Sequence, residues 1–396
     1  MGRSIVPVAP ESLMKASIVI PCYNAEKHVR ETIASARAQT IRDIEIICVD
    51  DGSTDETLLV LKQLAQEDDR IKVIERPNGG EGPCRETGRI AATGEWLYFL
   101  DADDLMLPNL LSHAIMRGEA TEADVVVFRT SELDSQTGET RRFPGCFDTS
   151  WLNLGPEERW FAPREHPERI FNSFQNWVHN KLYRASFVEE HRLAFQSLHR
   201  NADILFTCRA LAEASRIALL DEELHLYRVN NPQSALFTAD AWPLDFYVAF
   251  LALRSSLELH KTWELYRASF VNWAEEAVAM SLWRARSYES FLSIASTMRI
   301  EGLHRLGIDE LAGENAYSEL RHEQCAAIAC MDSAELAFYY FALERRHMQD
   351  LETELSYLRR SSDERVAALE GSVSLKVGRA VTALPRAALN ALRRHS

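Results

Sequence analysis

The chain has no apolar run near the roughly 20 residues that a membrane-spanning helix needs, and stretches such as Phe246–Leu253 are far shorter. Basic residues are in the minority, with 44 Lys and Arg against 59 Asp and Glu. Because binding to nucleic-acid phosphates requires a basic surface, the net charge of −15 argues against a nucleic-acid partner. The seven Cys include no Cys-x-x-Cys pair, which indicates reduced thiols in a cytoplasmic compartment.

Two further absences concern the N-terminal region. The first fifteen residues lack a long apolar core and contain Pro7 and Pro10, so we expect residues 1–15 to be a disordered lead-in and not a secretory signal. The Gly-x-Gly-x-x-Gly turn of nicotinamide-dependent oxidoreductases is missing after the first predicted strand, where Pro21–Asn24 stands instead. An oxidoreductase is therefore disfavoured.

Strand and helix patterns alternate through the first part of the chain. Apolar runs at 17–21, 44–49 and 71–74 are typical of buried strands, and residues 26–38 have helical spacing. With 396 residues, the chain exceeds the usual size of one domain, so at least two units are expected. The alternation predicts an α/β fold with a mostly parallel sheet flanked by helices.

A further strand pattern at residues 95–100 ends in three carboxylates, Asp101, Asp103 and Asp104, which we call the acidic edge. The C-terminal edge of an open α/β sheet is where such sheets bind ligands. Clustered carboxylate oxygens suit a divalent cation shared with phosphates. The alternative is a loop whose acids only cap the next helix, with Asp104 ahead of Pro108.

Four motifs occur in a fixed order over about residues 16–125, at Ile18–Asn24, Val49–Asp55, Asn78–Gly88 and Leu100–Asp104. With these motifs the chain resembles the family-2 glycosyltransferases, inverting enzymes that use nucleotide sugars and have the Rossmann-like GT-A fold. One position departs from the family, because Glu86 follows Arg85 where Asn is usual. That departure puts the polar contacts of this loop in doubt.

The resemblance implies that residues 16–125 form the half that binds the nucleotide sugar. Asp51 would accept a hydrogen bond from a uracil-like ring N–H, and Tyr23 would offer an aromatic face beside the base. Asp103, with Asp104, would ligate Mg²⁺ or Mn²⁺ at the diphosphate. Arg85 would add a positive charge there, although an Arg in a first helical turn can also be a surface residue. The expected donor-binding residues are Pro21, Tyr23, Asn24, Asp51, Arg85, Asp101 and Asp103.

The resemblance also implies a general base for the acceptor hydroxyl, an Asp at the start of a helix in the acceptor half. Asn180–Tyr183 matches the extended stretch that precedes it, and Asp203 then matches the base. Ala202 stands where the family usually has Glu, and a helix N-cap is the alternative role for Asp203. The segment Leu226–Arg228 resembles the family's Tyr-Arg segment, where Arg228 would contact the diphosphate or close a loop.

The remaining segments carry weaker signals. Residues 126–236 are expected to complete the acceptor half, and the irregular, aromatic stretch 125–167 is expected to hold loops whose Trp side chains either stack on sugars or pack internally. Residues 237–345 have helical spacing without a catalytic constellation and predict a helical extension.

The C-terminal residues have two patterns of their own. Residues 346–371 show three-four apolar spacing that predicts a short coiled-coil-like helix, interrupted at Ser362, through which a homo-oligomer could form. Residues 372–396 contain five Lys and Arg and no acid, which predicts a basic amphipathic helix on anionic lipid. The alternative is a helix that packs its apolar side on the protein itself.

The functional expectation follows from the resemblance. It implies metal-assisted, inverting transfer of a sugar, most simply from a UDP-sugar, to a hydroxyl of a glycan or lipid-linked acceptor in surface-polysaccharide synthesis. The enzyme would be cytoplasmic and peripheral on the inner face of the plasma membrane. The alternative is a catalytically inactive nucleotide-sugar-binding or glycan-binding module on the same fold, which would be expected to have lost the acidic edge or the base.

Overall fold

The computed structural model describes residues 14–143, 145, 147–152, 154, 159–231 and 240–371. The chain divides into two compact units at residues 330 and 331. The first unit holds a sheet with its helices and a helical region, and the second holds the helix α12 (Ser333–Gly371). Most of the predicted lead-in and the whole basic segment 372–396 lie outside the described residues.

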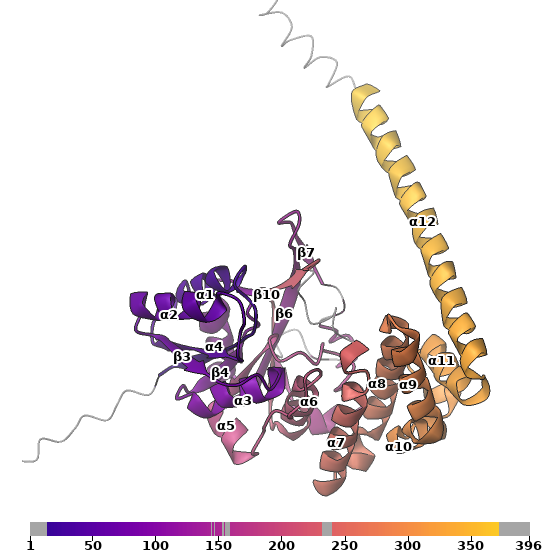
Figure 1. The fold of residues 1–396 in the computed structure, drawn as a ribbon, viewed down its shortest axis with the longest axis horizontal. Coiled ribbons are helices and arrows are strands. Elements are labelled where there is room, and N and C mark those ends of the chain that lie inside the picture. The colour runs from indigo at the N-terminus through magenta and orange to yellow at the C-terminus, as the bar shows by residue number, and fades with distance from the viewer. Residues whose placement is uncertain are drawn as a thin grey trace, which may run out of the picture. The chain divides into compact units, whose positions relative to one another are not determined.

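One sheet forms the centre of the first unit (Figure 1). Its strands are β1 (Ala16–Cys22), β2 (Ile44–Asp50), β3 (Ile71–Glu75), β4 (Trp96–Phe99), β5 (Leu105–Met106), β6 (Val125–Asp134), β7 (Thr140–Arg142), β8 (Trp160–Phe161), β9 (Lys181–Arg184) and β10 (Ile217–Val229). They follow the order β3-β2-β1-β4-β9-β6-β10-β5, with β7 beside β6 and β8 beside β10. The longer ladders, among β1 to β4 and between β6 and β10, are parallel, and the shorter ones are antiparallel. The predicted mixed, mostly parallel sheet is confirmed.

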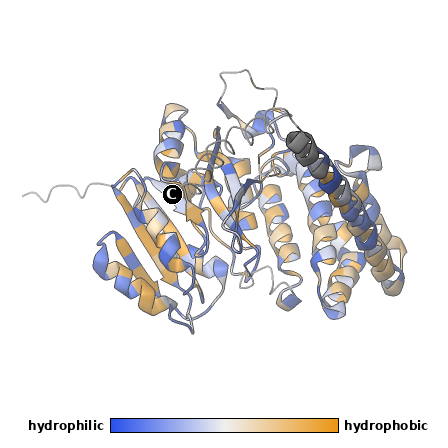
Figure 2. Ribbon diagram, turned by 90° about the horizontal axis from the view of Figure 1, so that it is seen from above, coloured by the Kyte–Doolittle hydropathy of each residue, from blue (hydrophilic) through white to orange (hydrophobic). Residues whose placement is uncertain are grey.

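Helices cover both faces of this sheet. Those of the first unit are α1 (Val29–Arg37), α2 (Thr57–Glu67), α3 (Glu81–Ala91), α4 (Leu110–Ala120), α5 (Ala185–Glu190), α6 (Asp203–Glu213), α7 (Asp245–Leu259), α8 (Trp263–Arg284), α9 (Tyr288–Thr297), α10 (Leu303–Leu306) and α11 (Glu319–Cys330). Because side chains alternate along β2, Ile46 and Cys48 pack with α1 and α2, whereas Ile47 and Val49 pack with Cys84 of α3. Figure 2 accordingly shows hydrophobic strands bordered by helices of mixed character.

Glycine positions α3 against the sheet. A Cβ at Gly88 would lie 2.3 Å from Cγ1 of Val19, so any side chain there would push α3 away from β1. Gly80, just before α3, has φ of +90°, a backbone conformation that favours glycine. The glycines of the third motif therefore set both the path of the loop after β3 and the close approach of α3.

Two sequence expectations about secondary structure were wrong. Residues 125–134, predicted as part of an irregular stretch, form the strand β6 in the middle of the sheet, because Val125–Phe128 are buried on both faces. The helix predicted to be interrupted at Ser362 continues through that residue as α12, from Ser333 to Gly371.

The helical C-terminal extension is confirmed, with α7 to α11 in the first unit and α12 in the second. Among the helices of the described ranges, none combines the length and the apolar character needed to span a membrane.

Candidate active site

The four sequence motifs meet at one edge of the sheet, since the parallel strands β1, β2 and β4 end there together. Asn24, after β1, accepts a hydrogen bond at Oδ1 from the backbone N–H of Thr54 (2.8 Å), and its own N–H donates to Oγ of Ser53 (3.1 Å). The first motif is thereby joined to the second. At the same edge Tyr23 is 51% exposed and Pro21 is half-buried.

Asp51, at the end of β2, binds the loop that follows β3. Its carboxylate is buried and accepts hydrogen bonds from Nη1 of Arg76 (2.8 Å) and from the backbone N–H groups of Gly79 (3.1 Å) and Gly80 (2.8 Å). Arg76 carried no signal in the sequence, although it follows β3 directly. Asp51 therefore fixes the glycine-rich loop as well as facing the edge where the motifs meet.

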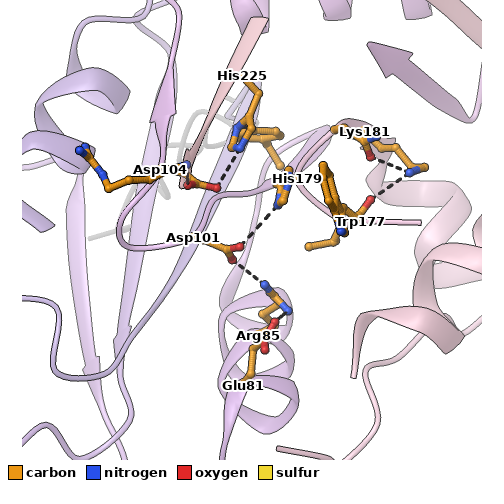
Figure 3. Close-up of polar contacts among 12 residues, drawn as sticks. Glu81, Arg85, Asp101, Asp104, Trp177, His179, Lys181 and His225 are labelled. Atoms are coloured by element: carbon orange, nitrogen blue, oxygen red, sulfur yellow. Dashed lines mark hydrogen bonds and ion pairs between the residues drawn. The ribbon is translucent and has the colours of Figure 1, made fainter. Parts of the chain in front are cut away.

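Arg85 and Asp101 form the centre of a charged network (Figure 3). Nη2 of Arg85 donates to Oδ1 of Asp101 (2.5 Å), and Nη1 is paired with Glu81 one turn earlier in α3. Nδ1 of His179 lies 3.4 Å from the other Asp101 oxygen. Burial acts to raise the pKa of the Asp101 carboxyl, but Arg85 and His179 outweigh it and hold that pKa well below its usual range. The surface alternative for Arg85 was wrong, because its side chain is 2% exposed.

Asp103 has the chemistry of a cation ligand. Its side chain is half-buried, and Oδ2 accepts a hydrogen bond from Nδ2 of Asn231 (2.8 Å). Burial, and then the negative charge of Asp101, raise the pKa of the Asp103 carboxyl. A divalent cation would offset this crowding of carboxylates, and carboxylate oxygens are the ligands that Mg²⁺ and Mn²⁺ prefer. The residues present therefore fit such an ion.

Asp104 faces inward and is fully buried. Its Oδ2 is hydrogen-bonded to Nε2 of His225 (2.9 Å), and its Oδ1 accepts from the backbone N–H of Arg228 (2.8 Å). Burial, then the charges of Asp103 and Asp101, raise the pKa of Asp104 well above its usual range, and burial lowers the pKa of His225 well below its own. Both shifts favour the uncharged forms of the two side chains, and the hydrogen bond between them joins β10 to the acidic edge.

The inward position of Asp104 bears on two of its predicted roles. The capping alternative was wrong, because α4 starts only at Leu110. As a metal ligand, Asp104 could act with His179 and His225, whose ligand atoms and its own lie within 4.8 Å of one another. Both ring nitrogens of His225 are already hydrogen-bonded, however, one to Asp104 and one to Oη of Tyr98. Asp103 is the better-placed ligand.

Arg228 holds the acidic edge from the side of β10. Its Nε donates to the backbone oxygen of Asp103 (2.5 Å), and its Nη2 pairs with Glu31 of α1 (2.8 Å). The side chain is 8% exposed. Of the two roles expected for Arg228, these contacts favour closing the loop over contacting a diphosphate.

Asp203 is the first residue of α6, and the N-cap position belongs to Ala202. Because Asp203 lies one residue past the N-cap, the N-cap alternative was wrong. Burial raises the pKa of the Asp203 carboxyl, while Arg85 opposes and Asp101 reinforces the rise. Asp203 thus lies within electrostatic reach of the Arg85–Asp101 pair. Asp203 also lines a cavity of about 310 Å³ between α6, α7 and α8, which we call the α6–α8 cavity.

The two departures from the family pattern have physical reasons. Ala202 is fully buried, and a Cβ at Gly82 would lie 2.7 Å from its Cβ, so there is no room for Glu where α6 meets α3. Glu86, in place of Asn, accepts a hydrogen bond from the backbone N–H of Phe195 (3.1 Å) and pairs with Arg89. Both substitutions therefore belong to the contacts between α3 and the segment that leads into α6.

His179 is a candidate site residue that the sequence analysis missed. Its ring stacks on that of His225, with centroids 4.3 Å apart, and it stands directly before the Asn180–Tyr183 stretch that was recognised. Lys181 in that stretch is fully buried and donates to the backbone oxygens of Gln175 (2.6 Å) and Trp177 (2.9 Å). The lysine therefore shapes the loop that presents Trp177 and His179, as Figure 3 shows.

The aromatic residues of the stretch 125–167 pack internally. The rings of Trp151 and Phe161 lie 6.1 Å apart, and both contact His166 edge-on. The ring of Trp160 is covered by the guanidinium of Arg216 at 4.7 Å. Of the two roles expected for these aromatics, their contacts favour packing over stacking on sugars.

Comparison with known proteins agrees with this geometry. The sequence profile of the family described as Glycosyl transferase family 2 matches residues 17–192. EpsH of Bacillus subtilis (strain 168), to which glycosyltransferase activity has been assigned provisionally, is 30% identical over 62% of this chain and 71% of its own length. The poly(ribitol-phosphate) β-N-acetylglucosaminyltransferase TarS of Staphylococcus aureus is 26% identical over 66% of this chain and 44% of its own length. The chain thus spans less than half of full-length TarS.

A solved structure shares the fold. Residues 1–349 of S. aureus TarS, crystallised with UDP-GlcNAc, superpose with a TM-score of 0.62 at 21% identity, over 84% of this chain and 92% of that one. The GT-A fold expected from the motifs is confirmed. Since EpsH is 30% identical and covered over most of its length, the chain belongs to glycosyl transferase family 2 and is a glycosyltransferase.

Proposed function

We propose that the chain transfers a sugar from a UDP-sugar to a hydroxyl of a cell-surface glycan, with inversion at the anomeric carbon. One observation carries the proposal: Asp203 interacts electrostatically with Arg85 and Asp101, and it also lines the α6–α8 cavity. Related proteins support the choice of substrates, because TarS was crystallised with UDP and with UDP-GlcNAc. TarS and a Bacillus relative are also named for transfer to poly(ribitol-phosphate).

The donor binds at the C-terminal edge of β1, β2 and β4. The exposed ring of Tyr23 stacks on the base, and Asp51 accepts the ring N–H beside it. The positive charge of Arg85, held by Asp101, acts on the diphosphate through a side chain that packing has already ordered. Pro21 and Asn24 complete this binding site at the end of β1.

Asp103 would hold a Mg²⁺ or Mn²⁺ ion, with Asp101 nearby as a further carboxylate. When bound, such an ion offsets the negative charge that develops on the departing nucleoside diphosphate.

Asp203 is the general base. Its carboxylate takes the proton from the acceptor hydroxyl as that oxygen forms a bond to the anomeric carbon. The bond between that carbon and the phosphate oxygen breaks at the same time, and UDP leaves with the electron pair. Asp203 is half-buried and lines the α6–α8 cavity, from which the acceptor reaches it.

The C-terminal residues serve location and assembly in this proposal. The basic segment 372–396 attaches the enzyme to the cytoplasmic face of an anionic membrane, where lipid-linked or growing surface glycans are reached. Exposed apolar side chains at Met348, Leu351, Leu355 and Leu358 of α12 favour pairing with a second copy.

A screen of nucleotide sugars tests the donor. We expect UDP and at least one UDP-sugar to raise the melting temperature in the presence of Mn²⁺, and that sugar to be slowly hydrolysed. ADP-, GDP- and CMP-sugars should have no effect. The proposal would be contradicted if none of these compounds stabilised the protein. It would also be contradicted if the only stabilising compounds contained a nucleotide other than UDP.

A further inference from the structure

The α6–α8 cavity is built from parts of the chain that no sequence motif marks. Beyond Asp203 of α6, its lining includes Phe246 of α7 and Trp273, Glu276 and Arg284 of α8. Its volume of about 310 Å³ is at the lower end of the range for small-molecule sites. The helical extension therefore supplies a wall of the cavity that contains the proposed base.

The cavity contains polar groups without partners. Asn176 is 7% exposed, and its Nδ2 donates to the backbone oxygen of Phe171 (2.8 Å). That bond fixes the orientation of the amide and leaves Oδ1 without a partner in the described part of the chain. The exposed side chains of Glu276 and Arg284 likewise form no ion pair or hydrogen bond there. A ligand with hydroxyl groups would satisfy these donors and acceptors.

Aromatic faces complete the lining. Trp242 is 42% exposed and stacks one face on His199, with centroids 3.6 Å apart and planes within 3° of each other. Trp177 also lines the cavity, and the loop that Lys181 shapes holds it in place. Flat apolar rings beside amide, carboxylate and guanidinium groups suit a molecule with both C–H faces and hydroxyls.

The charges that line the cavity nearly balance. They belong to Arg200, Asp203, Asp240, Glu276 and Arg284. Because three acids face two bases, the lining does not select a strongly charged ligand. A neutral hydroxyl-rich group fits better than a polyanion or a polycation.

We propose that the α6–α8 cavity binds a sugar or polyol unit of the acceptor, so that α7 and α8 determine which acceptor is used. This inference rests on the proposed function, because it takes Asp203 as the group that meets the acceptor hydroxyl. It assigns to the helical extension the recognition of the acceptor, separate from nucleotide binding at the sheet edge.

Filling the cavity tests the inference. Ala277 lines the cavity from α8, and Ala268 is an exposed alanine of the same helix that does not. We would compare Ala277→Trp with Ala268→Trp and wild type by saturation-transfer NMR, with UDP and Mg²⁺ present. The probes are the methyl glycosides of glucose, galactose and N-acetylglucosamine, together with ribitol and glycerol. UDP affinity is measured on the same samples.

We expect at least one probe to bind wild type and Ala268→Trp but not Ala277→Trp, with equal UDP affinity in all three. Should Ala277→Trp fail to fold, Arg284→Ala should weaken the same probe at least threefold, whereas Arg267→Ala on the outer part of α8 should not. Binding of UDP but of no probe by wild type would overturn the inference, as would wild-type probe affinity in the folded cavity variants. Absence of UDP binding in wild type would instead count against the proposed function.

Discussion

The acidic edge and the α6–α8 cavity differ in how their charged groups are satisfied. At the acidic edge, the buried guanidinium of Arg85 is paired with Asp101, which also meets His179. In the cavity, neither Glu276 nor Arg284 forms an ion pair within the residues that the structure describes. The charges of Arg85 and Asp101 are thus satisfied within the protein, whereas Glu276 and Arg284 remain able to bind a ligand.

This difference separates two kinds of residue. Where a buried charge is held by a protein partner, removing the partner leaves an uncompensated charge and costs stability. Where a polar group faces a cavity without a partner, its substitution costs binding or catalysis and little stability. Variants on the two sides should therefore differ in whether they lose folding or activity.

The largest effect is expected for Asp203→Asn. The substitution keeps the size of the side chain but removes the proton acceptor, so transfer should fall by about 10² to 10⁴. The melting temperature should stay near that of wild type, because Asn has the size of Asp and keeps an oxygen that accepts hydrogen bonds. Turnover in a glycosyl-transfer assay and a thermal melt measure the two quantities.

Asp69→Asn, at an exposed position of the same chain, is the control. Turnover of Asp203→Asn within a few-fold of this control would remove Asp203 from the role of base. A large fall in the melting temperature of Asp203→Asn would show that Asp203 also stabilises the fold.

Arg85→Ala should have the next largest effect, on stability. The free energy of unfolding should fall by about 3 kcal/mol, because the variant breaks a buried ion pair and leaves Asp101 uncompensated. The folded-state pKa of Asp101 is lowered, so its contribution to stability is present above its ordinary pKa and is lost on acidification. The variant should therefore lose less stability than wild type when the pH is lowered.

Arg89→Ala on the same helix removes the more exposed pair with Glu86 and should cost about 1 kcal/mol or less. Denaturant titration measures both variants. Equal losses of unfolding free energy would mean that the Arg85–Asp101 pair stabilises the fold no more than the Arg89–Glu86 pair does.

A smaller effect concerns pH. Burial raises the pKa of Asp203 above the ordinary value of about 3.9, and a base acts only when it has lost its proton. Turnover should therefore decrease as the pH falls through a value above about 3.9. Because the pKa of Asp103 is also raised, UDP affinity must be measured at each pH. Turnover that stays constant down to about pH 4 would contradict a raised pKa at the base.

The sheet edge could be predicted from sequence because each motif directly follows its strand in the chain. Each of β1, β2 and β4 is a short apolar run followed at once by a polar motif, and parallel pairing brings the motif ends together. Asp101 and Asp103 were predicted to lie at this edge in this way. The orientation of Asp104 was not, since it depends on His225, far along the chain in β10.

The cavity could not be predicted because its residues share no local pattern. Asn176, Asp203 and Arg284 come from a loop and two helices, and only tertiary packing brings them to one space. Helical spacing identified the extension but is the same for a helix that packs and for one that also lines a site. His179 was missed for a related reason, because its contact with Asp101 joins distant segments.

The division between the two sides is tested most directly by the affinity for UDP in the presence of Mg²⁺, measured by calorimetry for Asp103→Ala and Asp203→Asn. We predict binding weaker by about tenfold or more for Asp103→Ala, because a cation ligand is lost, and within twofold of wild type for Asp203→Asn. Equal losses in the two variants, or wild-type affinity in Asp103→Ala, would contradict the account.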